Sequence, residues 1–552
     1  MKKFFHLLFL FAASNYLFGQ AEYVNSDNRV YAFLERMDNL NIIQDYNSFE
    51  LPKTRREISR LLLSIKANDT QLDKIDKQIL DDFLIEYEYD ISKSVDYSDR
   101  IISSNGYDLF SQRNKYLYYY VDPAASVFIN ALGESHFISA SQSGLKENSF
   151  GGLGLIGGEI RGTVIDKFGF LISGYNGIAF GDRSASSLSD KLKFNYKFNE
   201  NQDSSFFDDT YGYLAVDLDF VRFKIGSDRL NVGYGPVKTM LGNNSPLFNY
   251  VSFNINYNFF NFSFFHGKLL GQTTTDTSFI TGSVRKIDEK YIGYHRIGFN
   301  ISNNIDFGFG EFIVYGDRPI DLSYLNPFSF YKSTEHANRD RDNSMLFFDF
   351  NNTSIRGLKF YSSLLLDDIN FSKLGTRWWG NQMLLTIGAS SSNLYNIAPI
   401  DINVEYIRID PYVFTHRLIR NNFSNYNFSL SALSNPNTAL MYFGIDYRLN
   451  YRLFLSTSFT YYEHGANPIN IDGSINENVG GSIQLGHRLF DSENTKFLAG
   501  DLEYGRIFSV KLSFEPVKQI FLTLDLNYLN ENLQSNFDNK LFYGSFQIIS
   551  RI

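Results

Sequence analysis

The chain has 552 residues, a formal net charge of −9 and no cysteine. The lack of cysteine excludes disulfides, thiolate metal sites and a lipid-modified N-terminus, and the mild acidity gives no support to nucleic-acid binding, which usually needs a basic face. Aromatic residues make up 17% of the chain, with 54 Phe and 37 Tyr. Membrane barrels place many such rings at the bilayer interfaces, so this excess favours a barrel, and no apolar run reaches the roughly 18 residues of a membrane helix.

The N-terminus has the three-part pattern of a secretory signal. Lys2 and Lys3 form a charged region, residues 4–13 form a short apolar region, and small or neutral residues lead to a cleavage point after Gly19. A helical membrane anchor would need a longer apolar stretch. We therefore predict that residues 1–19 are a signal peptide and that the protein is exported.

The next part of the chain has helical periodicity. Three runs place apolar residues on one face at helical spacing, namely 30–37, 58–65 and 72–83. Thr54 and Glu57 form a capping-box pattern at the start of the second run. The 3.6-residue period predicts roughly three amphipathic helices, and we assign residues 20–92 to a periplasmic helical segment. The polar residues 93–114 are predicted to be a linker.

Residues 115–552 show the alternation of strands that have one apolar and one polar face. In residues 440–462, for example, Met441 falls on one face and Asp446 and Arg448 fall on the other. A soluble sandwich would bury the apolar faces, whereas a membrane barrel turns them to lipid and lines its interior with the polar faces. Strand lengths suit a tilted bilayer crossing, so we predict a mainly β fold, a transmembrane outer-membrane β-barrel of about 16–18 antiparallel strands. Whether the interior is open or filled is left undecided.

Connections between the predicted strands differ in length. The alternation changes phase between Phe220 and Val221, which indicates a tight turn or a bulge. Longer polar loops rich in Asn and Ser are predicted at 182–190, 271–284, 421–436 and 463–477. Short turns that alternate with long loops are typical of outer-membrane barrels.

Two parts of the chain carry a more specific pattern. In the second half these are KYIGYHRIGFN at 290–300, GEFIVYGDRPIDLSYLNPFSFY at 310–331, RDRDNSMLFFDF at 339–350 and LLLDDINF at 364–371. In the N-terminal part they are RVYAFLERMDNL, LPKTRREISRLLLSI and KQILDDFLIEY. Together they resemble the Wzi family of capsule-assembly outer-membrane proteins, in the form found in Bacteroidetes-type bacteria.

The resemblance implies a wide barrel of roughly eighteen strands with a small helical bundle at its periplasmic end. Family members are linked to holding capsular polysaccharide on the cell surface, in the manner of a lectin. Similar proteins of gliding bacteria are associated with surface motility. The expected location is the cell outer membrane, and the expected partners are a surface polysaccharide, outer-membrane lipid and the barrel-assembly machinery.

The densest polar cluster consists of His336, Arg339, Asp340, Arg341, Asp342 and Asn343. The planar guanidinium of Arg pairs well with carboxylates, and Asp and Asn exchange hydrogen bonds with hydroxyls. The cluster is therefore a candidate glycan-binding site. The alternative is a salt-bridged loop that stabilises the barrel mouth.

Arg377, Trp378 and Trp379 form the second candidate glycan-binding site. A Trp ring can cover the apolar face of a pyranose while polar neighbours bind its hydroxyls. The alternative is an interface girdle, where Trp is enriched in membrane proteins.

Catalysis is not expected. The sequence has no H-E-x-x-H and no G-x-S-x-G, and its histidines are scattered. We predict no catalytic residue, no cofactor, no metal site and no nucleic-acid partner. The first prediction is a non-enzymatic barrel that binds or anchors surface polysaccharide. The alternatives are a component of gliding motility or adhesin display, with motility or envelope proteins as partners, and a diffusion porin.

Overall fold

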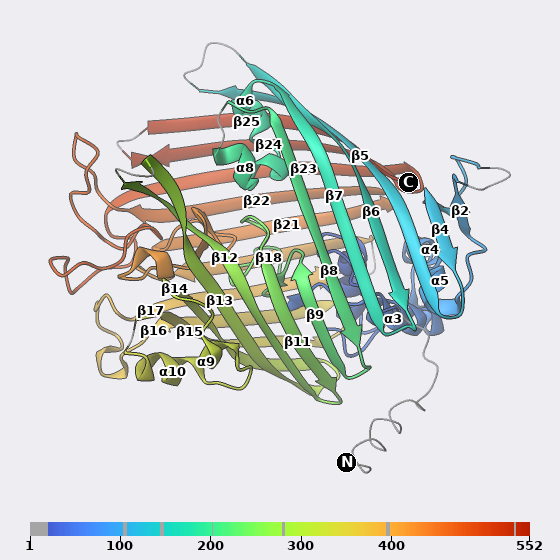
Figure 1. The fold of residues 1–552 in the computed structure, drawn as a ribbon, viewed down its shortest axis with the longest axis horizontal. Helices are drawn as coiled ribbons and strands as arrows, with labels where there is room; N and C mark the ends of the chain where they lie inside the picture. Colours follow the sequence, from blue (N-terminus) through green and yellow to red (C-terminus); the bar gives the residue numbers. More distant parts are fainter. Residues whose placement is uncertain are drawn as a thin grey trace.

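The computed structural model describes most of the chain after the predicted signal peptide, which lies outside the described residues. The described ranges are 20–102, 107–143, 148–200, 203–278, 282–339, 341–393, 398–534 and 537–552. Figure 1 shows a barrel of long strands, with the N-terminal helices at one end and long loops at the other.

Eighteen strands of the described residues close into an antiparallel ring in chain order. They are β5 (Ala125–Gln142), β6 (Ser149–Val164), β7 (Phe168–Gly181), β8 (Phe206–Asp217), β9 (Val221–Ser227), β11 (Asn249–Tyr257), β12 (Phe260–Ser278), β13 (Gly282–Ser302), β14 (Ile305–Gly316), β15 (Asn343–Ile355), β16 (Leu358–Asp368), β17 (Gln382–Ser392), β18 (Ile400–Ile409), β21 (Thr438–Asn450), β22 (Leu453–Ala466), β23 (Asp501–Val517), β24 (Ile520–Leu533) and β25 (Phe537–Arg551). The predicted mainly β barrel is confirmed, at the upper end of the predicted strand number.

The first and last strands of the ring meet at a seam. β25 pairs with β5 from Gln142 back to Leu132. Where β25 ends, β4 (Tyr118–Val121) pairs with the beginning of β5. Every strand of the ring therefore has a partner on both sides, which leaves no open edge inside a membrane.

The two ends of the barrel differ as the sequence indicated. Strands β8 and β9 are joined by residues 218–220, which confirms the turn predicted between Phe220 and Val221, and β21 and β22 are joined by residues 451–452. These turns define the short-turn end. The opposite, long-loop end carries the connections 228–248, 317–339, 410–437 and 467–500.

The long-loop end holds the small elements outside the ring. They are α6 (Arg183–Ser186), α7 (Asp190–Lys193), α8 (Tyr196–Glu200), β10 (Asn231–Val232), α9 (Leu322–Leu325), α10 (Tyr331–Ala337), η2 (Phe371–Lys373), η4 (Ile419–Asn421), β19 (Ser424–Asn425) and β20 (Phe428–Ser429).

The loop predicted at 271–284 is wrong. β12 continues to Ser278 and β13 begins at Gly282, so the two strands form a long hairpin at the long-loop end. Residues 273–278 read TTTDTS and have no apolar face. A strand that extends past the lipid needs no apolar face, because water reaches both of its sides, and the alternation signal is therefore lost there.

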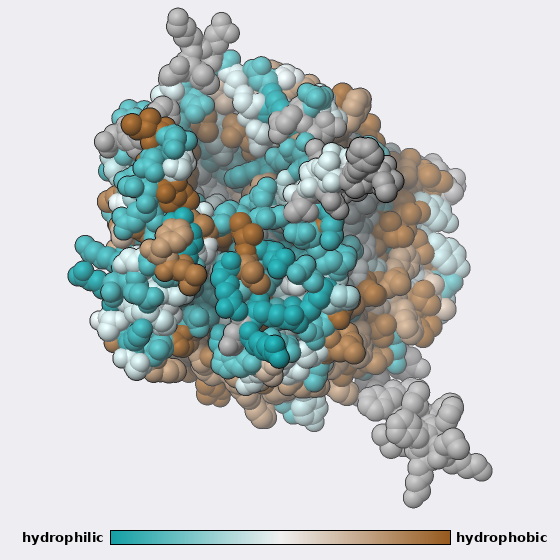
Figure 2. Space-filling view, turned by 60° about the vertical axis from the view of Figure 1, so that its left-hand side comes forward, coloured by the Kyte–Doolittle hydropathy of each residue, from teal (hydrophilic) through white to brown (hydrophobic). Residues whose placement is uncertain are grey.

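The strands turn apolar side chains outward. Met441 and Phe443 on β21 are 55% and 42% exposed, whereas Arg448 on the opposite face is 6% exposed. Exposed Phe, Ile and Leu residues recur on the outer face of most strands, and Figure 2 shows such a brown surface on the side of the barrel. The alternation at 440–462 therefore has the membrane geometry, with its polar face inside.

The N-terminal segment is helical, as predicted. It contains α2 (Val30–Asn39), α3 (Arg55–Ala67), the short η1 (Asp69–Gln71), α4 (Lys74–Glu86) and α5 (Glu88–Ser92). The side chain of Thr54 accepts a hydrogen bond from the backbone N–H of Glu57, the first half of the predicted capping box. The helices bury an apolar core of their own, which Tyr451 and Phe454 of the barrel flank. No helix among the described residues is long and apolar enough to cross a membrane.

The predicted linker contains a short strand. β2 (Ser98–Arg100) pairs in parallel with β3 (Asn114–Tyr116) at the short-turn end. Asn114 donates a hydrogen bond to the backbone carbonyl of Ile85 at 2.7 Å, so this segment is tied to the end of α4.

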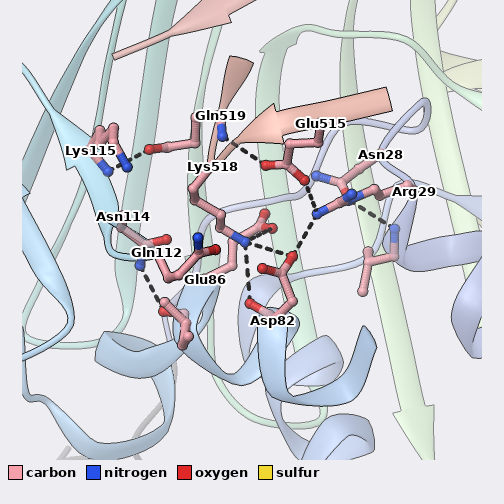
Figure 3. A network of polar contacts seen from close by, with 12 residues as sticks. Asn28, Arg29, Asp82, Glu86, Gln112, Asn114, Lys115, Glu515, Lys518 and Gln519 are labelled. Atoms are coloured by element: carbon pink, nitrogen blue, oxygen red, sulfur yellow. Dashed lines mark hydrogen bonds and ion pairs between the residues drawn. The ribbon is translucent and has the colours of Figure 1, made fainter. Parts of the chain in front are cut away.

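Ion pairs join the helical segment to the barrel (Figure 3). Asp82 of α4 lies 2.8 Å from Nζ of Lys518, in the turn between β23 and β24, and 2.7 Å from Arg29. Arg29 in turn lies 2.7 Å from Glu515 of β23. On another side, Arg36 of α2 lies 2.5 Å from Asp401 of β18, and Arg448 lies 2.6 Å from the same carboxylate.

The barrel interior is filled from both ends. The loop 228–248 enters the barrel, where β10 pairs with β1 (Glu50–Leu51) of the N-terminal segment. Phe49 beside this pair contacts the rings of Tyr234 and Phe347 at centroid distances of 4.9 and 6.0 Å, within a buried apolar core inside the barrel. For the described residues, buried side chains therefore occupy the barrel interior around this contact, and one cavity of about 80 Å³ beside the β1–β10 pair has room for only a few water molecules.

Candidate functional site

The long-loop end presents a mostly hydrophilic surface. Figure 2 views this end and shows teal side chains around a hollow, with a few brown apolar patches between them. Both groups of residues predicted to bind glycan belong to loops at this end. The two groups differ in burial and in the contacts that they make.

Trp378 and Trp379 belong to a four-ring group, called the aromatic cluster below, with Tyr412 and His487. The Trp379 and His487 rings stack face to face, with centroids 3.8 Å apart and planes 6° apart. Tyr412 meets both of them edge-on, at 5.6 and 5.4 Å. Trp378 lies 5.9 Å from Trp379 and, like Trp379, is half-buried. The cluster thus joins three loops, 369–381, 410–437 and 467–500.

Hydrogen bonds between two of these loops fix the Trp residues. The backbone N–H of Trp379 donates to the carbonyl of Glu493 at 3.1 Å, and Thr495 donates to the carbonyl of Arg377 at 2.8 Å. The indole N–H of Trp378 donates to the Glu493 carboxylate at 3.0 Å. The Trp residues are therefore held by loop contacts rather than by a lipid interface, which argues against the girdle interpretation.

Tyr412, from loop 410–437, is held in the cluster by hydrogen bonds to loop 467–500. Its backbone N–H donates to the carbonyl of Gly480 at 3.0 Å, and its hydroxyl donates to the carbonyl of Asn478 at 2.8 Å. Gly480 has a φ of +72°, and a Cβ there would lie 2.6 Å from the Tyr412 ring and backbone. Both the backbone conformation and the close approach require glycine at this position.

Charged groups surround the rings. The Lys373 ammonium lies 4.2 Å from the centroid of the Trp378 ring, and the side chain of Arg377 is exposed beside it. Arg488 pairs with Asp491 at 2.9 Å. Burial alone would raise the pKa of Asp491, but hydrogen bonds from Arg488 and Asn478 outweigh this effect and hold that pKa below its ordinary value. The pair therefore stays ionised and fixes the loop that carries His487.

The residues 339–343 are divided between two roles. Asp342 is buried and accepts two hydrogen bonds from Arg318, at 2.8 and 2.6 Å, and one from the Tyr324 hydroxyl at 2.8 Å. Asn343 is also buried and donates to the carbonyl of Thr415 at 3.3 Å. These two side chains support the loops, as the alternative interpretation expected, and are closed to a glycan.

The other members of that group have a different position. The side chains of Arg339 and Arg341 are exposed, and the Arg341 carbonyl accepts a hydrogen bond from Asn421 at 2.7 Å. Asp340 lies outside the described residues. Because Asn421 and Tyr412 both belong to the loop 410–437, this one loop contacts both predicted groups.

Sequence reasoning missed Tyr412, His487 and Glu493. They come from loops far apart in the chain, and no motif spacing connects them to the Trp pair. Two other histidines pair with carboxylates of the barrel: His295 contacts Glu311 at 3.0 Å and His464 contacts Glu503 at 2.8 Å. The described residues contain no group of three or more His, Cys, Asp or Glu that could hold a metal ion.

Comparisons with known proteins bear on the fold. No model of a known protein family matches the chain, and no curated protein matches it. The structure is similar to that of Wzi of Escherichia coli, an outer-membrane protein involved in group 1 capsule assembly and a carbohydrate-binding β-barrel, with a TM-score of 0.56 and 11% identity over 96% of this chain and 99% of that one.

Two further solved structures align with the barrel. They are OccAB4 of Acinetobacter baumannii, with a TM-score of 0.45 and 9% identity over 77% of this chain and 98% of that one, and OccK3 of Pseudomonas aeruginosa, with a TM-score of 0.40 and 11% identity over 77% and 95%. TM-scores this low do not establish a shared fold, so only the likeness to Wzi bears on the architecture.

A closed antiparallel ring with an apolar outer face and a polar, filled interior defines an outer-membrane β-barrel protein. The fold of the chain is similar to that of the Wzi β-barrel over 96% of its length. At 11% identity, this likeness establishes similarity of fold alone.

Proposed function

We propose that this protein binds or anchors a surface polysaccharide at its long-loop end, without catalysis. The observation that carries the proposal is the aromatic cluster, in which Trp378 and Trp379 are half-buried and fixed by hydrogen bonds from a neighbouring loop. Pre-organised rings lose little freedom when a sugar ring stacks on them. Arg377, Lys373 and Glu493 lie beside these rings and supply donors and acceptors for hydroxyls and acidic sugars.

The orientation of the barrel supports this proposal. Outer-membrane barrels have short turns on the periplasmic side and long loops outside the cell. The helical segment at the short-turn end would then face the periplasm, and the aromatic cluster would face the outside. The similarity in fold to Wzi, which is described as carbohydrate-binding, agrees with this arrangement. The filled interior favours binding over the diffusion porin considered from the sequence.

Binding to purified capsular polysaccharide of the source bacterium tests the proposal. We expect Trp379→Ala to weaken binding about tenfold, because central Trp contacts commonly carry more than 1 kcal/mol. Trp378→Ala and Arg377→Ala should weaken it less. Phe371→Ala is the matched control, because Phe371 is a 75% exposed aromatic residue in the same loop and outside the cluster. Equal affinity of the Trp379→Ala and Phe371→Ala variants would exclude this cluster as the site.

A deletion strain distinguishes the proposal from the motility alternative. Capsule retention and cell spreading are scored side by side in the deletion strain and after complementation with the intact gene or the Trp379→Ala variant. We expect capsule to be lost from the surface and to return only with the intact gene. Loss of spreading with normal capsule would contradict the proposal.

A further inference from the structure

The connection between β14 and β15 folds over the outer face of the barrel. Residues 317–339, called the wall loop below, contain α9 and α10, which lie beside β14 and β15 in Figure 1. Phe312 and Val314 of β14 belong to the core inside the barrel. The residues that alternate with them, Glu311, Ile313 and Tyr315, therefore lie on the outer face.

The same parity holds on the two preceding strands. Ile292 and Tyr294 of β13 and Phe265 and Leu269 of β12 belong to the inner core. His295 of β13 and His266 of β12 alternate with them and therefore point outward. These outward positions would face lipid on an uncovered barrel, yet Glu311 and His266 are 1% and 4% exposed.

The wall loop covers this polar group. The Glu311 carboxylate accepts hydrogen bonds from the backbone N–H groups of Tyr331 and Lys332 at 2.7 and 3.1 Å, and it lies 3.0 Å from Nε2 of His295. The Tyr331 ring stacks near His295 at 4.4 Å. The Glu311 carboxylate therefore has three polar partners, although it lies on the outer face of β14, where apolar residues are expected.

Aromatic contacts extend the cover across three strands. The Tyr315 hydroxyl lies 2.8 Å from Nε2 of His266 and accepts the backbone N–H of Asp321 at 3.0 Å. Tyr324 packs on Tyr315 at 5.1 Å. Phe328 stacks on Phe262 of β12 at 5.2 Å, two strands away from the strand that leads into the loop.

The middle part of the wall loop, residues 320–330, exposes four large apolar side chains. Ile320, Leu322, Phe328 and Phe330 are 51%, 76%, 71% and 54% exposed. On β13 itself, outward-facing Ile301, between the covered stretch and the short-turn end, is also exposed, at 66%. Phe350 and Phe360 continue the exposed apolar surface on β15 and β16. The exposed apolar residues on the outer face of the strands form an apolar belt around the barrel. The wall loop covers the polar residues Glu311, His266 and His295, which would otherwise interrupt this belt.

We propose that residues 320–330 of the wall loop lie within the bilayer, where Ile320, Leu322, Phe328 and Phe330 contact lipid acyl chains. Continuity with the exposed apolar residues Ile301, Phe350 and Phe360 on neighbouring strands identifies lipid as the occupant. A charged side chain that faces lipid destabilises a barrel, a cation more than a carboxylate. Pairing Glu311 under an apolar cover removes this cost.

Single cysteines test the proposal, because the chain has no native cysteine. Leu322→Cys and Phe328→Cys variants are labelled with a fluorophore and placed in phosphatidylcholine vesicles. Quenching is measured with nitroxide-labelled lipid and with aqueous iodide. Ile172→Cys on the barrel wall, where Ile172 is 62% exposed, is the lipid control, and Ile471→Cys, at a fully exposed loop position, is the water control. Heat-modifiable migration on gels confirms that each barrel is folded.

We expect both wall-loop labels to be quenched by nitroxide lipid as strongly as the label at 172, and several-fold less by iodide than the label at 471. Iodide quenching equal to that at 471 would place the loop in water and overturn the proposal. Shielding from both quenchers would also overturn it, because a protein partner or a second copy of the chain would then cover the loop.

Discussion

At the scale of single residues, Asp38 shows what enclosure by the barrel does to a carboxyl group. It lies on α2, is 3% exposed and faces Lys359, Asp306 and Glu35. Burial raises its pKa to about 8, although Lys359 acts in the opposite direction. The side chain is therefore uncharged at neutral pH while the helix is docked.

This carboxyl predicts how the docking of α2 depends on pH. Undocked, Asp38 would ionise at an ordinary pKa of about 4, so docking loses stability as pH rises from there to about 8. We expect Asp38→Asn to slow hydrogen exchange of α2 amides at pH 8 and to leave it unchanged at pH 4. Asp81→Asn, at an exposed position on α4, is the control. Slower exchange at both pH values would contradict this assignment.

Individual site residues were predictable to different extents. The Trp378–Trp379 pair was found because two adjacent rings beside Arg377 form a local pattern. Asp342 and Arg339 looked alike in sequence, but Asp342 pairs with Arg318 inside the fold and Arg339 is exposed. Such a difference depends on where the loop folds, and local composition carries no information about it.

At the scale of elements, buried ion pairs join the helical segment to the barrel. Asp82 of α4 faces Lys518, whose side chain is 1% exposed, at the turn between β23 and β24 (Figure 3). Glu515 approaches the same network through Arg29. Such contacts are costly when one partner is missing, because a buried charge is then left without its counterion.

Removal of Asp82 should therefore loosen α4. Loss of one partner of a buried pair costs about 3–5 kcal/mol, and Lys518 keeps the backbone carbonyl of residue 82 at 3.2 Å, which favours the lower value. We expect Asp82→Ala to speed hydrogen exchange of α4 amides about 100-fold. Asp81→Ala, at the exposed neighbouring position, should change it little. Equal effects of the two substitutions would show that the network adds no stability.

At the scale of the whole molecule, the interior is filled by two segments that meet inside the barrel. The N-terminal strand β1 pairs with β10 of a loop that enters from the opposite end. Around this pair, Phe49 packs between Tyr234 and Phe347, and the Arg296 guanidinium lies 4.7 Å from its ring centroid. This contact joins the N-terminal segment, a long loop and the barrel wall.

The filled interior predicts the behaviour of the protein in planar bilayers. A barrel of eighteen strands with an empty interior would form a wide aqueous channel, whereas this one should show no steady conductance. A porin that carries current in the same bilayers is the positive control, and heat-modifiable migration confirms that the inserted protein is folded. Steady conductance of the size of an open porin would contradict the filled interior.

The sequence by itself determined the helices at 30–39, 55–67 and 74–86 to within a few residues, and the barrel with its outward apolar face. The export signal stays a prediction. Helix and strand periods repeat every 3.6 or 2 residues, so a short stretch of chain contains them. Only the tertiary structure decided that β1 pairs with β10, that Trp379 stacks on His487, and that the wall loop covers Glu311. These contacts join residues that only closure of the barrel brings together, and no local period records them.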